Sequence, residues 1–145
     1  MKSILLITIL FTCVGCSFLQ NALPAPSCSE KLTIRYEESK YVDNKLQDAS
    51  CTVIFESGFN DTLEIYVDDK LLRRDFFETD DSMGYTGKGV EFNNDGKSLR
   101  ILRIKSVTRE RCMEITVDPR YKVMYIDAGE NGWVIFYANS FTEYE

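Results

Sequence analysis

Apolar and polar residues alternate along most of the chain after residue 30. The stretches 32–36 (LTIRY), 63–68 (LEIYVD), 112–117 (CMEITV), 121–126 (YKVMYI) and 132–138 (GWVIFYA) share a period of two. This period is typical of β-strands with one buried face and one exposed face. The pattern predicts about eight strands.

Turn-forming residues separate these stretches. Clusters of Asp, Asn, Gly and Pro lie at 68–69, 93–96, 118–119 and 129–132, and such residues favour tight turns between strands. Many short strands with regular turns are typical of antiparallel sandwiches and barrels. We therefore predict an all-β fold, a single antiparallel β-sandwich of about eight strands over residues 30–145. This frame hosts many functions, so the fold alone does not indicate one.

The start of the chain has a different pattern. Met1, Lys2 and Ser3 precede an unbroken apolar run of eleven residues, 4–14. A membrane-spanning helix needs about 20 apolar residues, so this run is too short, and its length fits the apolar part of a signal peptide. We expect a signal peptide over 1–15; the alternative is a buried N-terminal strand or helix.

The motif Cys13-Val14-Gly15-Cys16 ends this run. It resembles the lipobox of bacterial lipoproteins, in which a Leu, a small residue and Gly or Ala precede an invariant Cys. Gly15 and Cys16 match that pattern, whereas Cys13 stands where the family has Leu. The resemblance implies cleavage before Cys16 and acylation of its sulfur, because a thiolate is a good nucleophile and acyl chains hold a protein at a membrane.

Residues 16–29 follow as a lipidated N-terminus and a proline-containing tether. Ser17 replaces the aspartate that retains some bacterial lipoproteins at the inner membrane, and in this respect the chain resembles lipoproteins sorted to the outer membrane. We expect a lipid-anchored protein of the bacterial cell envelope, with the outer membrane favoured. The alternative is ordinary cleavage near this point and secretion as a soluble domain.

Three further cysteines follow Cys16: Cys28, Cys51 and Cys112. An exported protein meets an oxidising compartment, so we expect one disulfide and one free thiol. The alternation places Cys51 on the same face as Val53 and Phe55, whereas Cys112 lies opposite the apolar face of its strand. This favours a bridge from Cys28 to one of the other two, and Cys28–Cys51 is slightly preferred.

Charge and composition narrow the functional classes. The formal net charge is −6, and the chain contains no histidine. An acidic chain disfavours nucleic-acid binding, which needs a basic surface. The lack of histidine removes His-dependent nucleophilic catalysis and His-ligated metal sites. We expect no enzymatic activity and no cofactor.

The segment 77–89 (FETDDSMGYTGKG) is a long loop with acidic side chains that could bind a cation. Asp80 and Asp81, together with Asp61, are candidate Ca²⁺ ligands, although the segment does not fit an EF-hand because Tyr85 replaces the turn glycine. We favour the alternative of a solvated acidic loop, and hence no metal site.

Aromatic residues make up 12% of the chain. Tyr66 lies on the polar face of its strand, and Trp133 and Tyr137 share one face of the last strand. These three are a possible platform for stacking on a ligand, and core packing is the alternative that we favour for the last two.

The function expected from these features is a non-enzymatic binding or interaction module at the envelope. Its partners are the membrane, through the N-terminal lipid, and an unknown protein or glycan. One alternative is a carbohydrate-binding module, with or without Ca²⁺; another is an inhibitor or immunity-type protein of the envelope.

Overall fold

The structure is a computed structural model that describes residues 28, 30–37 and 50–141. These residues form nine strands and no helix, so no helix among them is suited to span a membrane. The strands are β1 Leu32–Tyr36, β2 Ser50–Phe55, β3 Asn60–Val67, β4 Lys70–Glu78, β5 Gly89–Asn93, β6 Arg100–Ser106, β7 Cys112–Val117, β8 Val123–Gly129 and β9 Gly132–Ala138.

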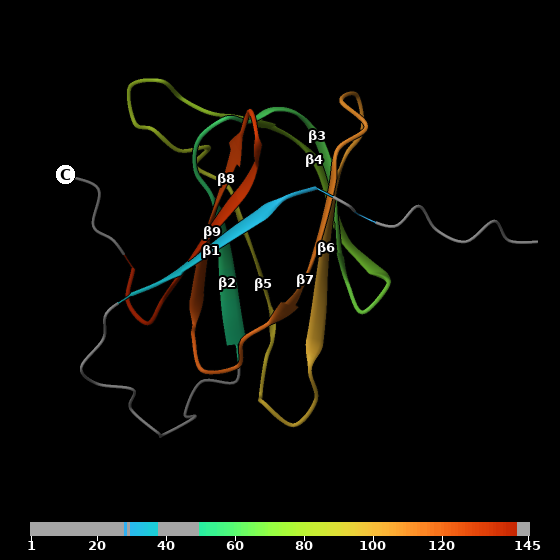
Figure 1. Ribbon diagram of the computed structural model, residues 1–145, viewed down its shortest axis with the longest axis vertical. Coiled ribbons are helices and arrows are strands. Elements are labelled where there is room, and N and C mark those ends of the chain that lie inside the picture. The colour runs from blue at the N-terminus through green and yellow to red at the C-terminus, as the bar shows by residue number, and fades with distance from the viewer. Residues whose placement is uncertain (1–27, 29, 38–49, 142–145) are drawn as a thin grey trace, which may run out of the picture.

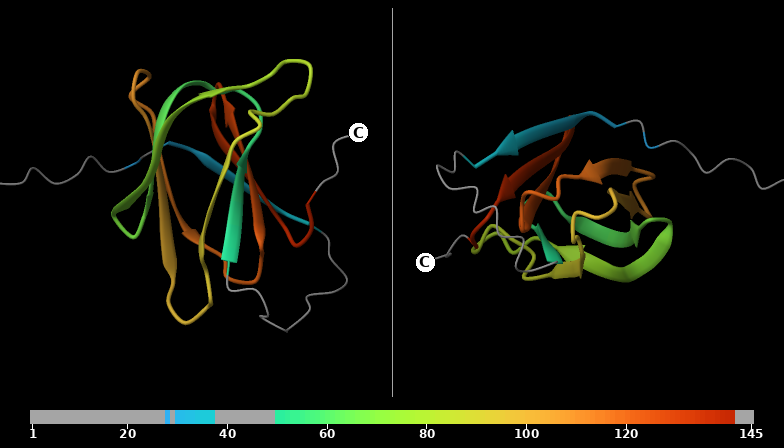
Figure 2. Two further views of the ribbon diagram at one scale, coloured as in Figure 1. Left: turned by 180° about the vertical axis from the view of Figure 1, so that it is seen from behind. Right: turned by 90° about the horizontal axis from the view of Figure 1, so that it is seen from below.

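The strands form two sheets that pack face to face (Figure 1). The first sheet has the order β1-β9-β8-β2-β5, and the second has the order β4-β3-β6-β7. Figure 2 shows the two layers from behind and from below. The predicted all-β sandwich is confirmed.

The strand directions differ in part from the antiparallel prediction. Of the seven strand pairs, β1–β9 and β2–β8 are parallel, and the other five are antiparallel. Alternation shows which face of the sheet a side chain occupies, but parallel and antiparallel strands have the same alternation. Whether two neighbouring strands are parallel depends on how the connections cross the sandwich. A local sequence pattern carries no information on these connections.

The core lies between the inner faces of the two sheets. Cys51, Val53 and Phe55 of β2 are fully buried there, as the alternation predicted. Leu63 and Ile65 of β3 face them from the other sheet and are also buried. Burial of such side chains contributes about 1.5–3 kcal/mol each, so this layer supplies the main stabilisation of the fold.

A second apolar cluster lies on the opposite face of the first sheet. Val123, Tyr125 and Ala138 are almost fully buried, and Ile54 and Phe136 pack against them. Val123 pairs with Ala138 and Tyr125 with Phe136, so these side chains share the outer face. Successive residues of a strand face opposite sides, and the alternate residues Met124, Ile126, Ile135 and Tyr137 therefore point to the core. The central strands of this sheet are therefore covered on both faces.

Ion pairs close the sandwich where β4 and β5 form its edges. Arg73 points inward from β4, donates to the Gly89 carbonyl of β5 (2.9 Å) and pairs with Asp75 (2.6 Å). Lys88 also contacts Asp75 (3.2 Å). Hydrogen bonds from Arg73 and Lys88 lower the pKa of Asp75 to about 2. Inward-pointing charges on an edge strand also disfavour pairing with other chains.

A disulfide closes the other side of the sandwich. Cys28 is bonded to Cys112 of β7, with 4.8 Å between their Cα atoms, and Cys51 is a buried free thiol. The preference for Cys28–Cys51 was therefore wrong, whereas the opposite orientations of Cys51 and Cys112 were predicted correctly. The chain leaves Cys28 to enter β1 at the edge of the first sheet, and β7 is the edge of the second. The bond therefore links the two sheets.

Candidate functional site

One end of the sandwich carries a cleft of about 470 Å³ between three connections. These are the β2–β3, β4–β5 and β6–β7 connections, at the top of Figure 1. We call it the loop-end cleft; its lining residues are Ser57, Gly58, Phe59, Asn60, Glu78, Thr79, Asp81, Gly84 and Arg109.

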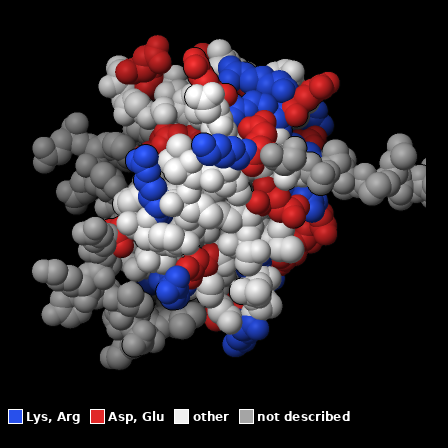
Figure 3. Space-filling view, in the orientation of Figure 1, with Lys and Arg blue, Asp and Glu red and all other residues white. Residues whose placement is uncertain are grey.

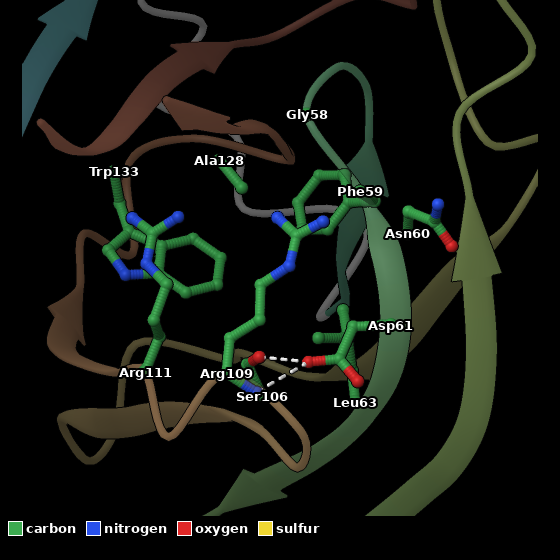
Figure 4. Close-up of a pocket in the computed structure, with 10 residues that line it drawn as sticks. All are labelled: Gly58, Phe59, Asn60, Asp61, Leu63, Ser106, Arg109, Arg111, Ala128 and Trp133. Carbon is green, nitrogen blue, oxygen red and sulfur yellow. Dashed lines mark hydrogen bonds between the residues drawn. The ribbon is translucent and has the colours of Figure 1, made fainter. Parts of the chain in front are cut away.

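Asp61 fixes the β6–β7 connection beside this cleft. Its carboxylate is 4% exposed and accepts hydrogen bonds from the hydroxyls of Ser106 and Thr108 and from the backbone N–H of Thr62. The backbone N–H of Arg109 also donates to it (3.3 Å). Burial acts to raise the pKa of Asp61, but the hydrogen bonds from Ser106 and Thr108 outweigh it and lower the pKa below its usual value. Asp61 is thus an anchor for the segment that carries Arg109 (Figure 4).

Gly58 holds the β2–β3 connection against β8. Its φ is +81°, and a Cβ at this position would lie 2.0 Å from the carbonyl oxygen of Ala128. Only glycine combines this backbone conformation with such a close approach. The Ala128 N–H donates to the Ser57 carbonyl (2.9 Å), so two strands fix this wall of the cleft.

Arg111 lines a small pocket of about 10 Å³ that adjoins the loop-end cleft and shares Gly58, Phe59 and Arg109 with it. Its guanidinium lies over the Trp133 ring, 5.1 Å from the ring centre, and pairs with Glu30 (2.8 Å). It also donates to the Gly129 carbonyl (3.0 Å). Figure 4 shows Arg111 above the indole and Arg109 extending toward Phe59. All these contacts engage Arg111 within the protein, so it supports the site.

Arg109 differs from Arg111 in its surroundings. It is exposed, and its side chain has no hydrogen bond or ion pair within the described part of the chain. The same holds for Glu78 and Asp81, which line the same cleft. Figure 3 shows charges of both signs side by side at the upper right, whereas the centre of this face is largely uncharged. A partner can therefore form ion pairs here without breaking existing ones.

The three aromatic residues considered as a possible stacking platform lie in different parts of the structure. Trp133 and Tyr137 are each 1% exposed, because their face of β9 packs against the second sheet. Tyr66 lies on the outer face of the second sheet, donates to Glu64 (2.8 Å) and is half-buried. The three rings therefore do not share a surface, and Trp133 and Tyr137 pack in the core, as in the alternative that we favoured.

The calcium candidates are also not assembled into one site. Asp80 accepts hydrogen bonds from the N–H and hydroxyl of Ser82 within its own turn. Asp61 is saturated by donors from the β6–β7 connection, and Asp81 is exposed. Across residues 28, 30–37 and 50–141, no group of three or more metal-binding side chains lies close together. Asp61, Asp80 and Asp81 therefore do not gather into one group of candidate ligands in this part of the chain.

Sequence reasoning missed Arg109 and Glu78. Arg109 belongs to the polar segment 106–111 (SVTRER), and charged residues are usual in turns between strands. Nothing in the sequence distinguishes it from Arg111, which is paired. Only the spatial arrangement shows which of the two guanidinium groups is free.

The comparisons with known proteins do not assign a family. No family model, curated protein or solved structure matches the chain. Cys16, the predicted lipidation site, lies outside the described residues, as do the predicted signal peptide (1–15) and most of the predicted tether (16–29).

Proposed function

We propose that the chain is a lipid-anchored binding module of the bacterial cell envelope, without catalytic activity, and that it binds a protein partner at the loop-end cleft. The lipobox-like motif ending in Cys16 supports the anchor, and Ser17 favours the outer membrane. The cleft supports the binding role. The two parts of the proposal rest on separate observations and are tested separately.

The unpaired charges of the cleft carry the binding proposal. Arg109, Glu78 and Asp81 line one concave surface and have no side-chain partner within the described residues. Asp61 and Gly58 hold the segments that carry or flank them. A rigid site of mixed charge loses little conformational entropy on binding, and its charge pattern gives specificity and steers association.

A protein partner fits this surface better than a glycan. Sugar rings commonly stack on exposed aromatic rings, and Trp133 and Tyr137 are both buried. The proposal includes an inhibitor or immunity-type protein, because such proteins also act by binding a protein partner.

The anchor is tested by intact mass. The full chain is expressed with its own leader in a bacterium and recovered from the membrane fraction. A mass that starts at Cys16 with added acyl chains supports the proposal, and Cys16→Ser should move the protein out of that fraction. An unlipidated mass with the same distribution for both proteins contradicts it.

The cleft is tested by site-specific photocrosslinking in the producing cells. A photoreactive residue at position 109 should give one discrete crosslinked protein. The matched control is position 97, because Lys97 is also exposed but lies in the β5–β6 connection at the other end of the sandwich. Replacing Glu78 by Lys in the position-109 protein should reduce the product by about tenfold, as expected for a reversed charge in a contact. If positions 109 and 97 give the same crosslinked proteins in the same yield, the proposal is contradicted.

A further inference from the structure

A second cleft opens at the opposite end of the sandwich, between β4 and β5. The strand β5 ends at Asn93, whereas the β3–β4 hairpin extends to its turn at Asp68 and Asp69. The beginning of β4 therefore has no strand facing it across the core. The pairing of β3 with β4 shifts register between Ile65 and Tyr66, so that Leu72 has no register partner in β3. The resulting space, which we call the β4–β5 cleft, measures about 330 Å³.

The β4–β5 cleft has an apolar wall. Val67, Leu72 and Phe92 line it from three different strands. Phe92 is 8% exposed and belongs to the core, whereas Leu72 is 43% exposed at the edge. An aliphatic or aromatic group placed here would bury further apolar area against all three.

The polar wall of the cleft has more donors than acceptors. Arg100 donates from Nη1 to Asp68 (2.7 Å), but its Nε is buried with no acceptor within the described residues. Lys70 also lines the cleft, and its amino group has no partner there. Two positive charges and one negative charge leave an excess of one positive charge, in a chain whose net charge is −6.

Asn94, next to this cleft, has an unpaired donor and an unpaired acceptor in the described residues. It follows Asn93, which lines the cleft, and is 3% exposed. Neither its Nδ2 nor its Oδ1 has a hydrogen-bond partner in the described part of the chain. Buried polar groups are nearly always paired in proteins, so this end of the sandwich holds several groups that lack partners.

We propose that the β4–β5 cleft binds a small amphiphilic monocarboxylate. Its carboxylate accepts hydrogen bonds from Arg100 and Lys70, and its apolar body lies along Leu72 and Phe92. One negative charge balances the local excess of one positive charge. A volume of about 330 Å³ matches the lower end of the usual range for small-molecule sites. This site is remote from the loop-end cleft and does not depend on the function proposed there.

Octanoate is a suitable probe, because it joins one carboxylate to a short alkyl chain. Binding is followed by amide chemical shifts of the full chain, with Cys16→Ser in every sample so that no attached acyl chain competes. A ligand with so few atoms should have a Kd on the order of millimolar. We expect saturable shifts centred on the lining residues, and weaker binding by about tenfold or more for octanol and octylammonium, which lack the negative charge.

Two variants test the two walls. Lys70→Gln should weaken octanoate binding several-fold, because it removes one positive charge. Leu72→Glu should abolish binding, because it places a carboxylate in the cleft; Leu72 is exposed enough for the fold to tolerate it. The matched control is Leu99→Glu, at a side chain that is 71% exposed and does not line the cleft.

Several results would overturn the proposal. These are the absence of saturable shifts at about 10 mM octanoate, which exceeds the expected Kd; equal binding of octanol; and equal loss of binding in Leu72→Glu and Leu99→Glu. Thermal unfolding of each variant separates a loss of binding from a loss of fold.

Discussion

At the residue scale, Asp61 shows how position changes the role of a side chain. In the sequence it is one of 23 acidic residues, and we considered it as a cation ligand. In the structure it is buried and accepts hydrogen bonds from Thr62, Ser106 and Thr108. Its negative charge is therefore satisfied by donors of the protein itself, and it joins the start of β3 to the β6–β7 connection.

Replacing Asp61 by Asn should destabilise the fold by about 1.5–3 kcal/mol at neutral pH, because the Nδ2 group would face donors that need an acceptor. The pKa of Asp61 is lowered in the folded state. Its contribution is therefore fully present above the unfolded-state pKa of about 4 and is lost as the pH falls through the lower folded-state pKa.

The measurement is denaturant unfolding of both proteins across this pH range. The difference in unfolding free energy between the unchanged protein and Asp61→Asn should be constant above about pH 5 and should decrease on acidification. Asp81→Asn is the control, because that side chain is exposed and has no partner within the described residues; it should change stability by less than about 0.5 kcal/mol. A gap that is independent of pH would contradict the prediction.

At the scale of elements, the two open sides of the sandwich are closed by different means. On one side, Arg73, Asp75 and Lys88 connect β4 and β5 through charge. On the other, the Cys28–Cys112 bond joins the segment before β1 to β7. The bond spans 84 residues of sequence, and cross-links that close long loops restrict the unfolded chain most strongly.

Replacing Cys112 by Ala should lower the free energy of unfolding by about 3–5 kcal/mol. Cys51→Ala is the matched control: it removes a buried thiol without touching the bond and should cost about 1–2 kcal/mol. A proteolytic map without reductant should contain a peptide pair linked through Cys28 and Cys112. A pair linked through Cys51, or equal destabilisation by the two substitutions, would contradict the structure.

At the scale of the whole molecule, the two ends of the described chain complete one sheet. The strand β1 pairs with β9, with Leu32 opposite Trp133 and Tyr36 opposite Tyr137. The core therefore needs residues from both ends before its inner face is complete. Such long-range pairing favours a single cooperative unit and slow folding, because distant segments must meet before they stabilise one another.

The single tryptophan offers a direct test of cooperativity. Trp133 is 1% exposed and packs in the core, close to Phe59. Its fluorescence should change at the same denaturant concentration as the far-ultraviolet circular dichroism of the strands, as expected for two-state unfolding. An earlier fluorescence transition would show that β9 separates from a sandwich that otherwise remains folded.

The sequence alone determined the strand class and most of the side-chain orientations. Alternation is a local property, and it assigned Cys51 to the core and Cys112 to the opposite face of its strand before any partner was known. It also reduced the faces of β9 to two choices. We favoured the core for Trp133 and Tyr137, but Val134 and Phe136 on the opposite face are apolar as well, so alternation alone could not decide between the two faces.

The tertiary structure decided everything that depends on which distant segments meet. It placed β1 parallel to β9, paired Cys28 with Cys112, and left Arg109 free while Arg111 pairs with Glu30. It also formed the two clefts, one between three connections and one beside the β3–β4 turn at the opposite end. A period of two records which way a side chain points, whereas partners and cavities arise from the packing of the sheets as a whole.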